Sequence, residues 1–173
     1  MFLSVPTDQP YSCQQDPEGF RLHRGAQFSI WAEDTLQSYQ DDLRRAKQEG
    51  SNLMTIKYAR MENLIPQKNF NPLIEEIVAL NVGWQKEIIE KYPNLMAGGR
   101  QISKSNDSII DTSFKTYLNG ELETYSDATL VLLHRDLVRL FNEGINGSMR
   151  IYENLTKRLG YDSIQAADQA RKV

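Results

Sequence analysis

The segment Pro72–Pro93, PLIEEIVALNVGWQKEIIEKYP, carries the clearest helical pattern in the chain. Its large apolar residues fall three or four positions apart, at Leu73, Ile77, Leu80, Trp84 and Ile88. This spacing places them on one face of an α-helix, as in a helix that packs against a core. A proline opens the segment and Tyr92-Pro93 ends it, because the residue before a proline disfavours helical backbone. The segment therefore predicts one long amphipathic helix.

Similar patterns extend on both sides of this segment. Further helices are expected from about residue 16 to 31, 34 to 49, 51 to 64, 111 to 122, 126 to 143, 146 to 159, and from 163 onward. Side chains suited to helix N-caps precede several of them, at Asp16, Ser51, Asp111, Ser126 and Ser163. No stretch shows the sustained alternation that marks a strand. The sequence predicts an all-α bundle of about seven to eight helices without a sheet, the 111–122 helix being interrupted near Gly120.

Length and composition favour one ordinary globular domain. The chain has 173 residues, which fits a single domain spanning residues 1–173. Residues 1–15 are expected to be irregular, and residues 94–110 are expected to form a long loop. The net charge is −3, which disfavours a nucleic-acid-binding protein. Cys13, His23 and His134 are too few for a transition-metal site, so no metal and no cofactor are expected.

Membrane insertion is also not expected. No segment approaches the roughly 20 apolar residues that a membrane span needs. The opening MFLSV is too short for the apolar core of a signal peptide and has no basic residues before it. The sequence therefore predicts a cytoplasmic protein.

Polar side chains interrupt the apolar face of the first helix. Phe20, Arg24, Gln27 and Trp31 fall within one sector of a helical wheel. Arg24 could extend outward at a helix end while Gln27 is a satisfied buried amide. Alternatively, the two side chains line a pocket.

Two cations flank the apolar face of the third helix. Lys57 and Arg60 lie about one turn apart, beside Tyr58 and Met61. Such a pair is often solvated. If it faces the interior, it provides an anchor for a carboxylate or phosphate.

The fourth and sixth helices carry polar residues in similar positions. Asn81 lies inside the apolar face of residues 72–93, and Glu76 lies at its edge, where burial would change its proton affinity. A buried amide needs a hydrogen-bond partner. His134 lies beside leucines of the sixth helix, as a core histidine or as a general base. In each case a structural role is the alternative.

The segment before the fifth helix is a weaker candidate for anion binding. Asp111-Thr112-Ser113 begins a helix, and a cap is its first explanation. Helix N-termini also offer N–H groups to anions, and Gly98-Gly99-Arg100 could complete such a site. Cys13 has no neighbouring base in the sequence, which disfavours its use as a nucleophile.

Several strings in the chain resemble the family of proteins of unknown function numbered 4125. They include Lys57-Tyr58-Ala59-Arg60-Met61, Asp111-Thr112-Ser113-Phe114, Thr116-Tyr117-Leu118, Glu121-Leu122 and Thr124-Tyr125-Ser126. The resemblance covers about residues 12–130 and implies an all-helical fold without a settled activity. The family pattern places an acidic helix with Glu-Trp-Glu before the Met-Phe pair that opens this chain, and no role of that helix is carried over.

The leading functional hypothesis is a small, metal-independent enzyme acting on an acidic or amino-acid-like metabolite, in a reaction such as isomerisation, cyclisation or elimination in specialised biosynthesis. Glu76, His134 and Tyr58 are the candidate catalytic residues. The candidate substrate-binding residues are Arg24, Gln27, Trp31, Lys57, Arg60, Asn81, Trp84, Arg100 and Tyr117. The alternative is a helical ligand-binding or protein-interaction module without catalysis. A homodimer is compatible with both.

Overall fold

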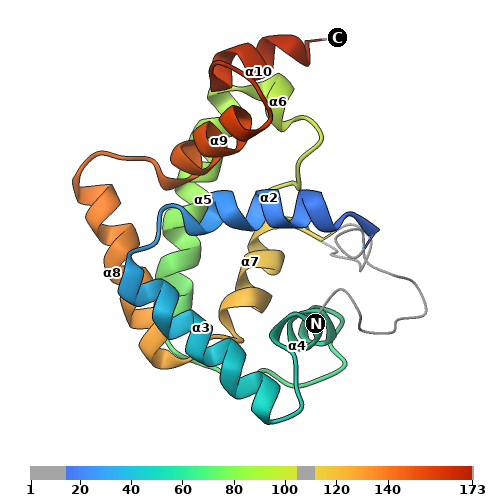
Figure 1. Cartoon of the computed structure of the whole chain (residues 1–173), viewed down its shortest axis with the longest axis vertical. Helices are drawn as coiled ribbons and strands as arrows, with labels where there is room; N and C mark the ends of the chain where they lie inside the picture. The colour runs from blue at the N-terminus through green and yellow to red at the C-terminus, as the bar shows by residue number, and fades with distance from the viewer. Residues whose placement is uncertain (1–14, 105–111, 173) are drawn as a thin grey trace.

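The computed structural model describes residues 15–104 and 112–172. Within these residues the chain forms nine α-helices and no strand (Figure 1), so the predicted all-α fold is confirmed. The helices are α2 (Pro17–Phe28), α3 (Glu33–Gln48), α4 (Leu53–Met61), α5 (Leu73–Lys91), α6 (Pro93–Met96), α7 (Phe114–Leu122), α8 (Asp127–Asn142), α9 (Gly147–Arg158) and α10 (Ile164–Ala170).

Two differences from the sequence-based helices concern short segments. The predicted loop 94–110 begins with helix, because α6 restarts directly after Tyr92 with Pro93 in its first turn. The break expected near Gly120 is absent, and α7 runs through this residue. Gly120 serves packing instead: a Cβ there would lie 2.8 Å from the Cγ atom of Met61. The glycine thus allows α4 to approach α7 closely.

Two of the expected caps are also displaced. Asn52, rather than Ser51, caps α4 by accepting from the backbone N–H groups of Met54 at 3.0 Å and Thr55 at 3.3 Å. Ser113 caps α7 through the N–H of Thr116. Asp111, like Cys13 and most of the segment 1–15, lies outside the described residues. Asp16, Ser126 and Ser163 act as N-caps as predicted.

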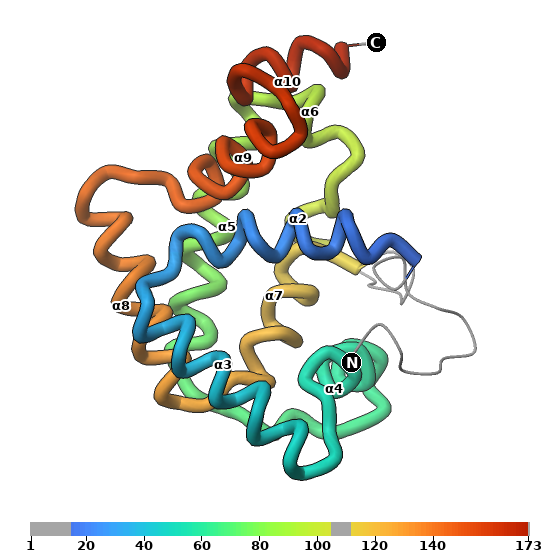
Figure 2. Tube along the Cα trace, in the orientation of Figure 1, coloured from blue at the N-terminus to red at the C-terminus, as the bar shows by residue number. Residues whose placement is uncertain are grey.

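Helix α5 is the central element, and α7, α8 and α9 pack against it (Figure 1, Figure 2). Four further pairs of helices pack against each other: α4 with α7, α3 with α8, α2 with α9, and α10 with α6. A larger apolar cluster surrounds the N-terminal part of α5, and a smaller one forms at its C-terminal end with α6 and α10. No helix in the described part of the chain is both long enough and apolar enough to span a membrane.

Gly147→Ala is expected to lower the free energy of unfolding by about 1–3 kcal/mol, the usual cost of overpacking a core. An added Cβ would lie 2.6 Å from Cζ3 of Trp84, a core residue that is only 4% exposed. Gly83→Ala is the control, because its Cβ would meet no atom within 4 Å. Denaturant unfolding should show Gly83→Ala as neutral or stabilising, and equal losses in both variants would contradict the close packing at Gly147.

Candidate functional site

A buried carboxylate, Glu121, is the centre of the candidate site. Its side chain accepts from Lys57 Nζ at 2.5 Å and from the hydroxyl of Tyr125 at 2.8 Å. Arg24 contacts both carboxylate oxygens, with Nη2 3.1 Å from Oε2 and Nη1 at Oε1. Glu121 is therefore held by two cations and one phenol.

Three helices bring these groups together, Arg24 from α2, Lys57 from α4 and Glu121 from α7. All three side chains are largely or fully buried, with 12% of Arg24, 1% of Lys57 and 4% of Glu121 exposed. Removing an ion from water costs several kcal/mol even when it has a partner. Because two cations share one carboxylate, this cluster carries an excess positive charge away from solvent.

The pKa values of the cluster follow from burial and charge. Burial alone would raise the pKa of Glu121, but the charges of Arg24 and Lys57 outweigh it and hold this pKa well below its ordinary value. Burial and the neighbouring Glu121 carboxylate raise the pKa of Tyr125 well above its ordinary value. Glu121 consequently remains ionised and Tyr125 remains a hydrogen-bond donor across the neutral pH range.

A cavity of about 550 Å³ borders this cluster, between α2, α5, α7 and α9. Its volume lies within the range of about 300–1,000 Å³ that is usual for small-molecule sites. Its polar lining residues are Asp16, His23, Arg24, Gln27, Asn81, Gln85, Arg100, Tyr117, Glu121, Ser148 and Tyr152. Phe20, Phe114, Leu118, Ile151 and Leu155 add apolar walls. The cavity thus combines convergent polar groups with an apolar surface.

Arg100 is the cation of this cavity that is open to solvent. Its guanidinium lies 4.5 Å from the ring centroid of Tyr117, and Lys57 Nζ lies 3.1 Å from the same centroid. Arg100 Nη1 donates to the carbonyl oxygen of Thr112 at 2.9 Å. Within the described residues Arg100 forms no ion pair, so none of their carboxylates occupies the rest of its guanidinium, which has the geometry to bind an anion.

The family model described as "Protein of unknown function (DUF4125)" matches residues 1–169 of this 173-residue chain. The chain belongs to this family. No curated protein and no solved structure matches it. Membership in DUF4125 confirms the resemblance indicated by the sequence.

Five of the residues predicted to bind substrate meet in the cavity of this DUF4125 protein. They are Arg24, Gln27, Asn81, Arg100 and Tyr117. Gln27 accepts from Arg24 Nη1 at 2.7 Å and so positions the guanidinium. Asn81 has the partner that its burial requires, since its amide donates to the carbonyl of Ile77 at 2.8 Å. Lys57 lies directly behind the Tyr117 ring.

The predicted catalytic pair lies elsewhere. His134 Nε2 is 2.9 Å from Glu76 Oε2, with 58% of the Glu76 side chain exposed. Neither residue lines the 550 Å³ cavity, and no other residue of α8 lines it either. Tyr58, the third candidate, also lies outside its lining. The expectation that Glu76 is the buried carboxylate is wrong, since Glu121 holds that position.

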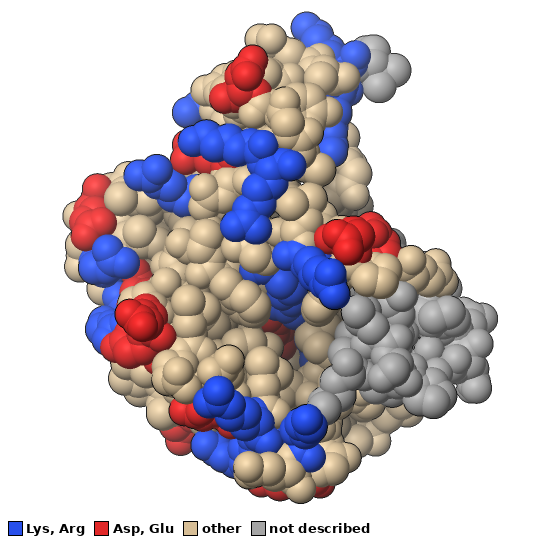
Figure 3. Space-filling model, viewed as in Figure 1, with Lys and Arg blue, Asp and Glu red and all other residues tan. Residues whose placement is uncertain are grey.

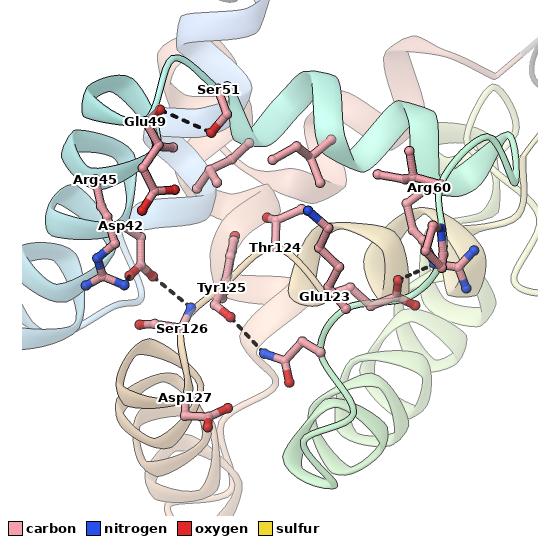
Figure 4. A pocket seen from close by; sticks show the side chains of 17 residues that line it. Asp42, Arg45, Glu49, Ser51, Arg60, Glu123, Thr124, Tyr125, Ser126 and Asp127 are labelled. Carbon is pink, nitrogen blue, oxygen red and sulfur yellow. Dashed lines mark hydrogen bonds and ion pairs between the residues drawn. The ribbon is translucent and has the colours of Figure 1, made fainter.

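Arg60 lies in a different pocket, of about 450 Å³, that Figure 4 shows from close by. Arg60 Nε is 2.7 Å from Oε2 of Glu123, and the two atoms form an ion pair without hydrogen-bond geometry. Burial raises the pKa of Glu123, and Arg60 partly offsets this rise. Arg60 thus pairs with Glu123 rather than with Glu76 or with the Arg24 cluster.

The two tryptophans predicted to bind substrate are core residues. Trp31 packs edge-on against Phe28 and Tyr39, with ring centroids 5.0 and 5.6 Å apart. Trp84 packs against Gly147 and belongs to the same apolar cluster. Neither residue lines the cavity.

Glu121, Gln85 and Tyr125 were not identified as site residues from the sequence. The sequence of α7 and the residues directly after it contained a usable signal, because Phe114, Tyr117, Glu121 and Tyr125 follow one another at helical spacing. A carboxylate within such an aromatic face needs a buried partner. The sequence placed Glu121 only in a string that carried the family resemblance, without a role.

Proposed function

We propose that this protein binds a small organic acid in the cavity between α2, α5, α7 and α9. The observation that carries the proposal is the excess positive charge of the Arg24–Lys57–Glu121 cluster at the wall of this cavity. A buried positive charge attracts an anion more strongly than a fully solvated charge does. Arg100 would hold the ligand carboxylate through its fork of N–H donors, with its guanidinium steadied by the Tyr117 ring.

The remaining lining suits an amino-acid-like metabolite. Gln27, Asn81 and Gln85 offer amides, and Ser148 and Tyr152 offer hydroxyls, which can bind amine, amide or hydroxyl groups of a ligand. The apolar walls would take up its carbon skeleton. As part of this proposal the ligand is a metabolite of the cytoplasm, the location expected from the sequence.

Binding has more support than cofactor-independent catalysis. Glu76 and His134, the groups expected to move protons, do not line the cavity, and Glu121 is held ionised by its cations. An isomerase, cyclase or lyase activity here would need another proton-transfer group. His23 lines the cavity, and histidine is the side chain that most often serves as a general acid or base, so His23 is the candidate for that enzymatic alternative.

A thermal-shift series with small monocarboxylates, amino acids and N-acetyl amino acids tests the proposal. A ligand that binds only the folded chain raises the melting temperature with its concentration. Matched amides that lack the carboxylate should raise it much less. If no acid of this size stabilises the protein, or if the amides do so equally, the proposal fails.

Arg100→Met is expected to weaken the binding of such an acid by roughly tenfold to a hundredfold, the range for losing a charge-assisted hydrogen bond. The ligand-free melting temperature should change little, because Arg100 is exposed. Arg139→Met is the control, since Arg139 is an exposed arginine of α8 outside the cavity. Titration calorimetry that gives the same affinity for Arg100→Met and wild type would remove Arg100 as the anchor.

A further inference from the structure

A second cavity, of about 450 Å³, opens between α2, α3 and α4. Figure 3 shows a hollow on this face below α2, with lysine and arginine side chains along its lower edge. The larger apolar lining residues are Phe20, Phe28, Tyr39, Leu43, Leu53 and Met54. Leu43 is 42% exposed, so part of this apolar wall faces solvent. We call this cavity the α2–α4 groove.

The charges of the groove have one sign. Arg24, Arg44 and Lys47 line it, and among the described residues no carboxylate does. Arg24 at the inner end is committed to Glu121, and Arg44 Nη1 lies 2.8 Å from Asp41 on the exposed face of α3. Lys47 forms no ion pair with any residue in 15–104 or 112–172, so no carboxylate of these residues pairs with its positive charge at the mouth of the groove.

The inner end of the groove also suits apolar groups. Met54 Sδ lies 3.2 Å from Nη2 of Arg24, and the rings of Phe20 and Phe28 lie within 6.0 Å of its guanidinium carbon. A polar ligand end would find few free donors here, because Arg24 already serves Glu121 and Gln27. An apolar chain would instead contact methionine, leucine and aromatic surfaces.

We propose that the α2–α4 groove binds an amphipathic monocarboxylate, with its apolar chain among Phe20, Leu43 and Met54 and its carboxylate at the mouth beside Lys47. The apolar interior and the positive mouth complement this one class of ligand. This site goes beyond the proposed function, because the organic acid described above occupies the other face of α2. Phe20 and Arg24 line both cavities, so α2 forms the wall between them.

The affinities of acetate, hexanoate, octanoate and decanoate, measured by calorimetry, test this inference. Each CH₂ that becomes buried should raise the affinity by about threefold to fourfold until the groove is filled, which is the transfer free energy of about 0.8 kcal/mol per CH₂ expressed as a ratio. Affinities that do not rise with chain length would overturn the inference.

Leu43→Asp should weaken decanoate binding at least about tenfold, because it places a carboxylate in the groove. Leu36→Asp is the matched control, since Leu36 is an exposed leucine of the same helix outside the groove. Equal affinity of wild type and Leu43→Asp, or equal losses in both variants, would overturn the inference. If Leu43→Asp does not fold, Lys47→Met serves in its place and should weaken decanoate binding about twofold to fivefold. An unchanged affinity in Lys47→Met would overturn the inference.

Arg100→Met separates the two sites. It should weaken the binding of short acids and leave decanoate binding unchanged. If Arg100→Met weakens decanoate binding while Leu43→Asp does not, decanoate binds in the cavity between α2, α5, α7 and α9. That result would overturn the groove assignment and leave the proposed function standing. If short acids do not stabilise the wild-type protein while decanoate still binds it, the proposed function is wrong and the groove assignment holds.

Discussion

Glu121→Gln is expected to lower the free energy of unfolding by about 3–5 kcal/mol, the usual cost of removing one partner from a buried ion pair. The amide would leave the positive charges of Arg24 and Lys57 buried without a counterion. Equilibrium unfolding in urea measures this loss. Glu75→Gln, on the exposed side of α5, should change stability by no more than about 0.5 kcal/mol.

The sign of the pH dependence checks the same cluster. The pKa of Glu121 is lower in the folded chain than in the unfolded chain. Its contribution to stability is therefore fully present above the unfolded-state pKa and is lost as the pH falls toward the folded-state pKa. In Glu121→Gln this part of the acid-side loss should disappear. The same slope in both proteins would contradict the assigned ionisation of Glu121.

Lys57→Met should cost less stability than Glu121→Gln, because the remaining Arg24–Glu121 pair is neutral. The same variant removes the excess positive charge and should weaken carboxylate binding. A stability loss as large as that of Glu121→Gln would show that Lys57 serves the fold rather than the ligand.

Trp84→Ala is expected to lower the free energy of unfolding by about 3–5 kcal/mol, the range for deleting a large aromatic side chain from a core. Trp84 is 4% exposed and belongs to the larger apolar cluster. Gly147 packs directly against its ring, so α5 and α9 would face a void between them. Urea unfolding gives the size of the loss.

The ligand affinity of Trp84→Ala distinguishes this core role from the substrate-binding role that the sequence suggested. Folded variant protein, studied well below its melting temperature, should bind a small acid with nearly wild-type affinity. Trp84→Phe retains most of the ring volume and should lose clearly less stability. A stable Trp84→Ala that loses the ligand would contradict the core assignment.

The helices were predictable because their signals are local. The spacing of Leu73, Ile77 and Trp84 and the caps at Asp16 and Ser126 depend on residues within a few turns. Helix α6 was missed because one turn after a proline carries no periodic pattern. Ser51 was mistaken for a cap because Asn52, directly after it, has the same chemistry.

The site was only partly predictable, since a helical wheel shows which face a residue occupies but not which helix covers that face. Arg24 was identified from its aromatic neighbours, but its partner Glu121 is 97 positions away. His134 and Glu76 do contact each other, but the Glu76 side chain is 58% exposed rather than buried. Their helices α8 and α5 pack together at a contact that does not border the cavity, and no local pattern specifies this pairing.

The most direct test of the proposed organic-acid site is a titration of the ¹⁵N-labelled protein, followed through its side-chain amide resonances. The ligand is the small carboxylate that raises the melting temperature most. Bound in the cavity, it should shift the resonances of Gln27, Asn81 and Gln85 in a saturable manner with one common affinity. The amide of Asn63, beside Arg60, should not move. Saturable shifts at Asn63 with none at the three cavity amides would contradict an organic-acid site between α2, α5, α7 and α9.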